Sequence, residues 1–321
     1  MTLPRILVPL LVLTGAIACS NEGGKQFSYP VTVVDSSEYQ EVDSLFSIES
    51  LERFVIDGPG ADEQKMFVAE YQADGEERRA IVYPVPIQSE GKSDASDEKK
   101  EHRYRREKWQ FLSAAVKEHS NDSDRFITYW DNAQRLRLFT GRAAVPELPA
   151  ESAYPSAEEK SLWRRIAGGF GKEEQLVTFA QCLVGRSEDA KECLSPLFTN
   201  AGDNYILVST DDMAHIQEIS RLAGRSLPLE TRLFSTDSDL HGRIRQVREW
   251  AREGEGTGSY MLQPVDANYV RAWRIIDPAF EESLLAGLLP FTSSADKDFA
   301  DLKLVFQSDW GGYLSLYQIT H

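Results

Sequence analysis

The sequence lacks the short motifs that hold the commonest cofactors. It has three cysteines and five histidines among 321 residues, and no C-x-x-C-H segment occurs, which excludes covalent attachment of a c-type haem. No G-x-G-x-x-G follows a predicted strand, and neither a P-loop nor a G-x-S-x-G elbow is present. The histidines are scattered without the spacing of metal ligands, and His215 and His241 are expected on solvated helix faces. We therefore expect no metal site and no cofactor.

Positive charge is also scarce. Lys and Arg number 35 against 51 Asp and Glu, so the formal net charge is −16. Such a balance repels polyanions, and we expect no binding of nucleic acid. Basic partners would be attracted instead. The hydrophobic share of 41% is enough for a sizeable packed core in one large domain or two ordinary ones.

Long apolar runs are absent except at the N-terminus. Arg5 gives a small positive start, and Ile6–Thr14 is an apolar run of the length found in secretory signals. That run is too short to span a bilayer core of about 30 Å as a helix. Residues 1–18 are therefore predicted to be a signal peptide, and no other segment is predicted to span a membrane.

The end of this signal has two interpretations. Its Ala-Ile-Ala step suits ordinary signal peptidase, and the same step followed by Cys19 resembles a bacterial lipobox. Cysteine arithmetic favours lipidation, because a modified Cys19 leaves Cys182 and Cys193 as an even pair in an oxidising compartment. Residues 19–25 would then be a flexible tether. We expect the chain at the periplasmic face of a bacterial membrane, and Ser20 favours the outer membrane.

Composition divides the rest of the chain into three parts. Residues 26–88 contain short alternating runs typical of antiparallel strands, with an Asp-Gly hairpin step at Asp74-Gly75. Residues 89–103 are charged and without periodicity, which favours a solvated linker. Residues 104–321 alternate between apolar runs and amphipathic helices, which is typical of an α/β domain.

The strand Asn204–Ser209 is apolar throughout, as in strands that are buried on both faces of a parallel sheet. Further strands are expected at Phe126–Trp130, Gln175–Val184 and Leu229–Phe234 and in four C-terminal runs, and helices at Tyr104–His119, Asn132–Thr140, Glu158–Ala167, Ser187–Phe198, Met213–Leu222 and Leu240–Ala251. The segment Glu281–Leu289 is ambiguous between the two. This order predicts an α/β fold whose mixed sheet has a parallel βαβ core and antiparallel C-terminal strands, preceded by the β-rich N-terminal region.

The first candidate contact residues lie where a predicted strand runs into a helix, at Trp130-Asp131-Asn132. Asp131 is placed to be the N-cap, and Gln134 would complete a capping box. Capping requires neither Trp130 nor Arg135, whose guanidinium could stack on the indole. A structural and a recognition role both stay open, because ligands tend to dock at strand ends in α/β sheets.

The segment Ser209-Thr210-Asp211-Asp212 repeats this arrangement after a second strand. Its acids complement the dipole of the following helix, which is a sufficient structural reason for them. If the two strands are neighbours, Thr210 and Asp211 would join the first group of residues. Convergence of Asp131 with Asp211 and Asp212 would instead favour an acid site with a shared metal or a raised pKa.

Cys182 and Cys193 lie eleven residues apart. A disulfide that closes so short a loop would stabilise the fold by about 2–3 kcal/mol. The alternative is two unpaired buried thiols. Redox catalysis is not expected, because no C-x-x-C motif is present.

Several segments, in their order along the chain, resemble the HaoB proteins, which are hydroxylamine oxidation proteins named for pairing with an octahaem hydroxylamine oxidoreductase. The segments are Tyr129–Arg142, Tyr205–Met213, Asp239–Gly254, Arg271–Ile275, Leu288–Phe291 and Leu304–Ile319. The likeness covers roughly residues 105–320. Tyr129–Asn132 is also similar to the W-W-D-Y-G step of oligosaccharyltransferase catalytic subunits, although the metal-binding membrane domain of those enzymes has no counterpart here.

The resemblance implies a role in hydroxylamine oxidation. Together with the lipobox-like start and the lack of catalytic motifs, it favours a non-enzymatic, membrane-tethered accessory protein. Its partner would be the octahaem hydroxylamine oxidoreductase or a cytochrome, and the contact residues would be those at the two strand ends. Two alternatives stay open. One is a carboxylate-dependent hydrolase or transferase, and the other is a lipoprotein that binds a glycan or peptide through Trp130.

Overall fold

The computed structural model describes residues 31–40, 42–56, 64–86, 95–235, 240–254, 256–264, 269–295, 297–308 and 313–320. The predicted signal peptide, tether and Cys19 lie outside these residues. Among the helices in the described ranges, none is both long and apolar enough to cross a membrane.

The N-terminal region contains an antiparallel sheet with the strand order β1-β3-β4-β5. Its strands are β1 (Val31–Val33), β3 (Ile48–Ile56), β4 (Gln64–Ala73) and β5 (Glu76–Val82). The turn between β4 and β5 has positive φ at Asp74 and Gly75, as an Asp-Gly hairpin requires. A further antiparallel pair joins β2 (Tyr39–Gln40), which follows the turn η1 (Ser36–Glu38), to β6 (Val85–Pro86). The β-rich N-terminal region is confirmed.

The charged segment before residue 104 corrects one prediction. Residues from Ala95 belong to α1 (Ala95–His119), so the second half of the predicted linker is helical. The first residues of this helix are almost all polar, so the sequence shows no apolar periodicity there. The apolar residues that hold the helix against the protein begin only in its second half. They are the predicted stripe Trp109, Leu112 and Val116, which is fully buried.

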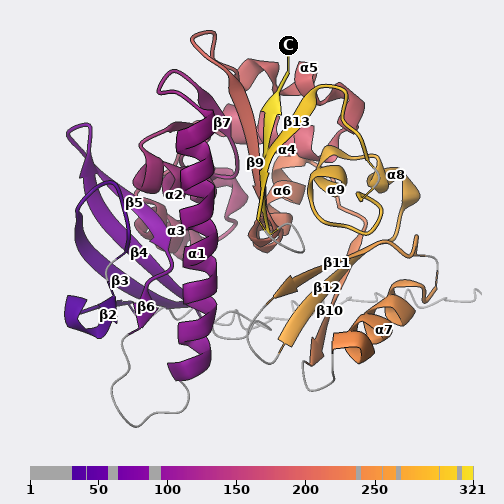
Figure 1. The fold of residues 1–321 in the computed structure, drawn as a ribbon, viewed down its shortest axis with the longest axis horizontal. Helices are drawn as coiled ribbons and strands as arrows, with labels where there is room; N and C mark the ends of the chain where they lie inside the picture. Colours follow the sequence, from indigo (N-terminus) through magenta and orange to yellow (C-terminus); the bar gives the residue numbers. More distant parts are fainter. Residues whose placement is uncertain are drawn as a thin grey trace, which may run out of the picture.

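A five-stranded mixed sheet forms the centre of the molecule, in the order β13-β14-β9-β7-β8 (Figure 1). Its strands are β7 (Arg125–Ile127), β8 (Ala143–Val145), β9 (Asn204–Ser209), β13 (Leu302–Gln307) and β14 (Leu314–Ile319). Strand β7 is parallel to both β8 and β9, whereas β14 is antiparallel to β9 and β13. The predicted fold class, with a parallel core and antiparallel C-terminal strands, is confirmed.

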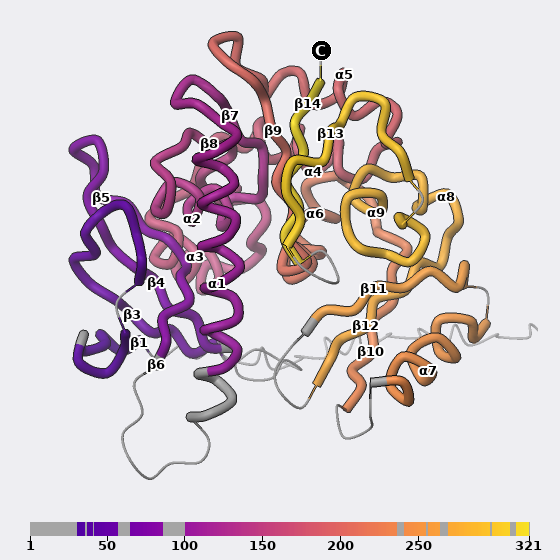
Figure 2. Tube along the Cα trace, in the orientation of Figure 1, coloured from indigo at the N-terminus to yellow at the C-terminus, as the bar shows by residue number. Residues whose placement is uncertain are grey.

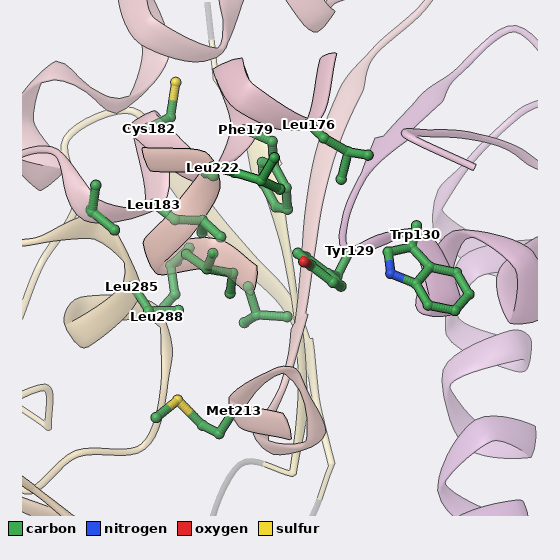
Figure 3. Packing of buried hydrophobic residues seen from close by; sticks show 14 of the residues in the cluster. Tyr129, Trp130, Leu176, Phe179, Cys182, Leu183, Met213, Leu222, Leu285 and Leu288 are labelled. Carbon is green, nitrogen blue, oxygen red and sulfur yellow. The ribbon is translucent and has the colours of Figure 1, made fainter. Parts of the chain in front are cut away.

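Strands β7 and β9 of this sheet are buried on both faces. Ile127 and Ile206 lie in one apolar cluster with residues of helices α4 (Glu173–Val184), α6 (Ile216–Ala223) and α9 (Leu284–Leu288). Phe126 and Tyr205, which point the opposite way along the same strands, lie in a second cluster with residues of α1, α2 (Trp130–Thr140) and β4. Figure 3 shows part of the first cluster, including Leu176, Phe179 and Leu183 of α4 and Leu285 and Leu288 of α9.

One of the helices around the sheet stands where a strand was predicted. The helices are α2 (Trp130–Thr140), α3 (Ala157–Ala167), α4 (Glu173–Val184), α5 (Ala190–Leu194), α6 (Ile216–Ala223), α8 (Pro278–Glu281) and α9 (Leu284–Leu288). Short 3-10 turns lie between them: η2 (Glu151–Ala153), η3 (Ser187–Asp189), η4 (Ser195–Leu197) and η5 (Thr210–His215). The strand predicted at Gln175–Val184 is helix α4. Its buried residues Leu176, Phe179 and Leu183 follow the helical rather than the strand period.

A third sheet, in the order β10-β12-β11, lies below the central sheet in the view of Figure 2. It contains β10 (Leu229–Ser235), β11 (Tyr260–Pro264) and β12 (Tyr269–Ile275), all antiparallel. Helix α7 (Leu240–Ala251) packs Val247 and Trp250 against Ala272 of the central strand. The strand at Leu229 is therefore present, but it belongs to this small sheet.

Candidate functional site

The two strand ends singled out by the sequence do meet. Strands β7 and β9 are parallel neighbours, so α2 and η5 begin side by side at the same edge of the sheet. The Asn132 amide donates to Asp212 Oδ1 over 2.6 Å, which joins the two segments directly. The sequence predicts that Thr210 and Asp211 lie near the first group only if the two strands are neighbours, and this condition holds.

Asp131 is not the N-cap that the sequence predicted. Strand β7 ends at Ile127, so α2 starts earlier than expected, with Tyr129 as N-cap and no side-chain capping bond. Asp131 instead stands within the first turn, where its Oδ1 accepts the backbone N–H of Asn132 at 2.9 Å. The Gln134 amide donates to another helix's end, at the carbonyl oxygen of Ala167. No capping box forms, and the Asp131 carboxylate is left for other partners.

Arg135 is one of those partners. Its Nη2 pairs with Asp131 Oδ2, its Nη1 donates to Asn132 Oδ1 at 2.5 Å, and its Nε donates to the Ile81 carbonyl oxygen at 3.0 Å. The guanidinium lies over the rings of Tyr83 and Trp109, at 5.2 and 5.1 Å from their centres. The predicted stacking on Trp130 is therefore not what the structure shows. Arg135 is fully engaged inside the protein.

His215 is the second partner, and its prediction as a solvated residue is wrong. Its Nε2 lies 3.5 Å from Asp131 Oδ2, and its Nδ1 lies 3.4 Å from Glu218 Oε2. The ring stacks on Tyr129 at 4.5 Å between centres. The residue stands three and four positions before buried Glu218 and Ile219, and this helical spacing was a signal that could have placed it on the inner face.

These contacts shift the pKa values of both groups. Burial raises the pKa of Asp131, but the charges of Arg135 and His215 outweigh it and hold that pKa well below its usual range. Burial alone would lower the pKa of His215, whereas Asp131 and Glu218 raise it to about 10. An imidazolium between two carboxylates therefore persists at neutral pH.

Asp212 has the opposite character. Its Oδ2 accepts the backbone N–H of Ser209 at 2.9 Å, in a capping box with the Ser209 hydroxyl. Burial first, and then the nearby charge of Asp131, raise the pKa of Asp212 to about 7. Asp212 is thus a buried carboxyl group that exchanges a proton near neutral pH.

Asp211 anchors the side of the network that faces α1. Its Oδ2 accepts from Arg105 Nη1 at 2.7 Å, from the Tyr83 hydroxyl at 3.3 Å, and from the Tyr313 hydroxyl. Sequence reasoning missed Arg105. It stands four residues before Trp109, on the predicted buried stripe of its helix, and that position was the available signal. Beside it, the Thr210 carbonyl oxygen accepts from the amide of Gln263 in β11 at 3.0 Å.

All six predicted contact residues are covered by the protein. None is more than 8% exposed, and Trp130 and Asn132 are completely buried; the six are Trp130, Asp131, Asn132, Arg135, Thr210 and Asp211. We call these six residues, with Asp212, His215 and Glu218, the polar cluster. It is an interior charge network that ties α2 to η5 and α6, with Arg105 adding α1. Binding through its members stays a prediction.

A pocket of about 240 Å³ lies at the opposite end of β9. Its walls include Tyr205, Lys303, Leu304 and Gln318, and the Tyr205 hydroxyl donates to the His119 carbonyl oxygen at 2.7 Å. This pocket holds none of the residues of the polar cluster. Within the ranges that the structure describes, no group of three or more His, Cys, Asp or Glu side chains is arranged to hold a metal ion.

The structure places Cys182 on α4 and Cys193 on α5 close enough for a disulfide, with their Cα atoms 5.6 Å apart. This separation is the one that a disulfide requires. The bond would join two helices that flank the turn η3.

Comparison with known proteins gives one match along nearly the whole chain. The family model described as HaoA-associated protein HaoB matches residues 6–319. No curated protein matches. Among solved structures, the crystal structure of the C-terminal domain of PglB from C. jejuni is similar with a TM-score of 0.40 and 9% sequence identity, covering 67% of this chain and 100% of that chain.

Proposed function

The chain belongs to the family of the HaoA-associated protein HaoB, and from that premise we propose that it is a membrane-tethered periplasmic accessory protein of hydroxylamine oxidation. It binds or supports a haem oxidoreductase, the hydroxylamine oxidoreductase in the first place, or an electron carrier. The observation that carries the proposal is the family match over residues 6–319. The family's description names association with HaoA, and association is the activity we assign.

The charge of the chain supports a contact role. With a formal net charge of −16, the protein attracts a basic surface on a partner over long range and speeds the encounter. Binding of this kind weakens as salt screens the charges. The proposal therefore expects an association that is strongest at low ionic strength.

We assign the polar cluster a positioning role in this contact. Asp131, Asn132 and Asp212 hold the starts of α2 and η5 together, and Arg105 links η5 to α1. Buried pairs of this kind specify one arrangement of the elements that carry them. Helix α2 is buried along almost its whole length, so the exposed face of α1, rather than α2 or the covered Trp130, is then the surface presented to a partner.

A pull-down tests the association. The tagged full-length chain is recovered from detergent-solubilised membranes of a hydroxylamine-oxidising bacterium, and haem proteins are detected by in-gel haem staining and identified by mass spectrometry. We expect enrichment of the hydroxylamine oxidoreductase over an unrelated tagged lipoprotein, and loss of that enrichment at high salt. Recovery of no haem protein above the control would refute the proposal.

A second candidate, a carboxylate-dependent hydrolase or transferase, is favoured by one observation. The pKa of Asp212 is raised to about 7 by burial and by Asp131, and general acids and bases work best near the ambient pH. Its test is the hydrolysis of p-nitrophenyl acetate and p-nitrophenyl phosphate by the purified chain and by Asp212→Asn. Turnover that the substitution abolishes would support this candidate, and absence of turnover above buffer would remove it.

A further inference from the structure

Strand β10 is an open edge of the small sheet β10-β12-β11. It pairs with β12 along all seven of its residues, and α7 covers one face of the sheet through Val247 and Trp250. Residues 230–233 are all exposed, with Leu233 at 43%. Within the described ranges, no backbone hydrogen bond joins β10 to a strand other than β12. An open edge of this kind is a template for another strand.

The ladder with β12 shows which backbone groups face outward. Ile276 N–H donates to the Pro228 carbonyl oxygen at 2.9 Å, one position before the pair Leu229–Ile275. Because hydrogen-bonded pairs alternate in an antiparallel ladder, Glu230 and Arg232 also direct their backbone groups to β12. The N–H and C=O groups of Thr231 and Leu233 therefore point away from the sheet, as does the C=O group of Leu229, whereas the Leu229 N–H donates to the Leu227 carbonyl oxygen at 2.9 Å.

The residue order of the strand is self-complementary about Thr231. In an antiparallel pairing of two copies centred there, Thr231 meets itself across the axis and exchanges both backbone hydrogen bonds. Glu230 then lies opposite Arg232 of the second copy, and Leu229 lies opposite Leu233. Within the chain Glu230 pairs with Arg274, and Arg232 lies over Trp250 and 3.9 Å from Glu253. Their side chains stay 49% and 51% exposed, so each still presents its charge at the edge.

The side chains on the face away from α7 fit the same arrangement. The register of β10 with β12 places Leu233, Thr231 and Ser235 on one face with Tyr269, which is 47% exposed. Pairing would bring Leu233 against Leu229 of the second copy and remove apolar surface from water. Opposite charges occupy the other face, where like charges would repel.

We propose that two copies of this chain associate through β10, with a two-fold axis at Thr231, so that their small sheets join into one continuous sheet. The interface is isologous and closes on itself, because each copy offers the same edge. The competing interpretation is that Glu230 and Arg232 are edge charges that prevent strand pairing. The two interpretations differ in the solution state and in the register of contact.

Cysteine cross-linking tests the register in which the two β10 strands pair. In the full-length chain, Thr231→Cys would place two thiols across the axis with Cα atoms about 5.5 Å apart. Leu233→Cys is the matched control, because its copies lie offset by four residues, or about 13 Å along the strand. We expect mild oxidation to give a reducible dimer with Thr231→Cys and no dimer with Leu233→Cys. The unsubstituted chain should give none either, and it controls for cross-linking through Cys19.

Charge-reversal variants test how much the charged pairs contribute to the affinity of the same interface. Analytical ultracentrifugation of the full-length chain in detergent, up to about 0.1 mM, should show a monomer–dimer equilibrium. Arg232→Glu and Glu230→Arg should each weaken it about tenfold or more, since like charges then face each other. The double variant Glu230→Arg/Arg232→Glu restores opposite pairs and should recover the dimer. Circular dichroism checks that every variant is folded.

Three outcomes would overturn this assignment. The first is an unsubstituted chain that stays monomeric over the whole concentration range. The second is equal cross-linking by Thr231→Cys and Leu233→Cys. The third is a dimer whose dissociation constant is unchanged by Arg232→Glu and by Glu230→Arg. Each is independent of whether the chain binds a haem protein.

Discussion

At the scale of single residues, Asp131 is shared by two buried cations. It pairs with Arg135 inside its own helix and with His215 from η5. These charges are out of water, so each is tolerable only while its partner is present. Removing one partner of a buried pair leaves the other charge uncompensated, which costs about 3–5 kcal/mol.

We therefore predict that Asp131→Asn lowers the free energy of unfolding by about 3–5 kcal/mol. Urea unfolding followed by tryptophan fluorescence measures it. The matched control is Glu249→Gln, which breaks an ion pair with Arg245 on the surface. The side chain of Glu249 is 62% exposed and that of Arg245 is 81% exposed. Such a surface pair should change stability by less than about 1 kcal/mol. Equal small losses in both variants would contradict the role assigned to Asp131.

His215 makes stability depend on pH. Burial lowers its pKa, but Asp131 and Glu218 raise it from 6.5 to about 10. The folded state then holds the proton more tightly than the unfolded chain, so this contribution is complete below about pH 6.5 and is lost as the pH rises through about 10. The stabilisation amounts to at most about 5 kcal/mol.

The measurement is the urea midpoint between about pH 6.5 and about pH 10. We expect the midpoint of the unsubstituted chain to fall across this range, and the slope to be much smaller in His215→Gln. His241→Gln, at an exposed position on α7, should keep the original slope. A His215→Gln profile parallel to that of the unsubstituted chain would show that the imidazolium is not the source.

The sequence located part of this network and missed the rest for a physical reason. Trp130, Asp131 and Asn132 are adjacent in the chain, and a strand followed by a helix marks their place. Arg105 and Tyr313 reach Asp211 from elements that are far away in the sequence, so only the fold brings them together. The sequence predicts Asp131 as a cap because the strand is expected to end at Trp130, whereas β7 ends three residues earlier, at Ile127.

At the scale of elements, α4 shows where local pattern is ambiguous. An apolar run as short as Gln175–Val184 fits a buried strand as well as a helix. The choice was made by packing, since α4 buries Leu176 and Phe179 against the sheet's apolar cluster. Strand β9 was easier to predict, because it is apolar at nearly every position and is buried along its whole length.

The pairing of α4 with α5 gives the third prediction. Replacing both cysteines, as Cys182→Ala/Cys193→Ala, should lower the free energy of unfolding by about 2–3 kcal/mol, because an eleven-residue loop is no longer closed in the unfolded chain. Thiol alkylation of the denatured, unreduced protein should leave both native residues unmodified. Alkylation of Cys182 and Cys193 without reductant would show that no disulfide had formed.

At the scale of the whole molecule, the order of the predicted elements indicated the fold class, and composition gave the excess of acidic charge. Neither predicts which strand lies at the edge of the third sheet. Its strands follow from turn and alternation signals, whereas the open edge at β10 depends on which strand lies beside which. Among the strands that the structure describes, the order β10-β12-β11 leaves β10 unpaired on one side. A sequence pattern contains no such information, because strand order is decided by packing of the complete chain.

The fourth prediction separates tethering from recognition. If Cys19 carries the lipid, Cys19→Ser should move the chain from the membrane fraction to the soluble periplasm, because one lipidated residue with its acyl chains supplies most of the membrane affinity. Fractionation with immunoblotting measures the shift, and mass spectrometry of the N-terminal peptide identifies the lipid. The released variant should still recover the haem protein in the pull-down, since the contact surface is unchanged. A variant that stays in the membrane fraction would contradict the lipid anchor, and a soluble variant that no longer binds would show that attachment to the membrane contributes to partner binding.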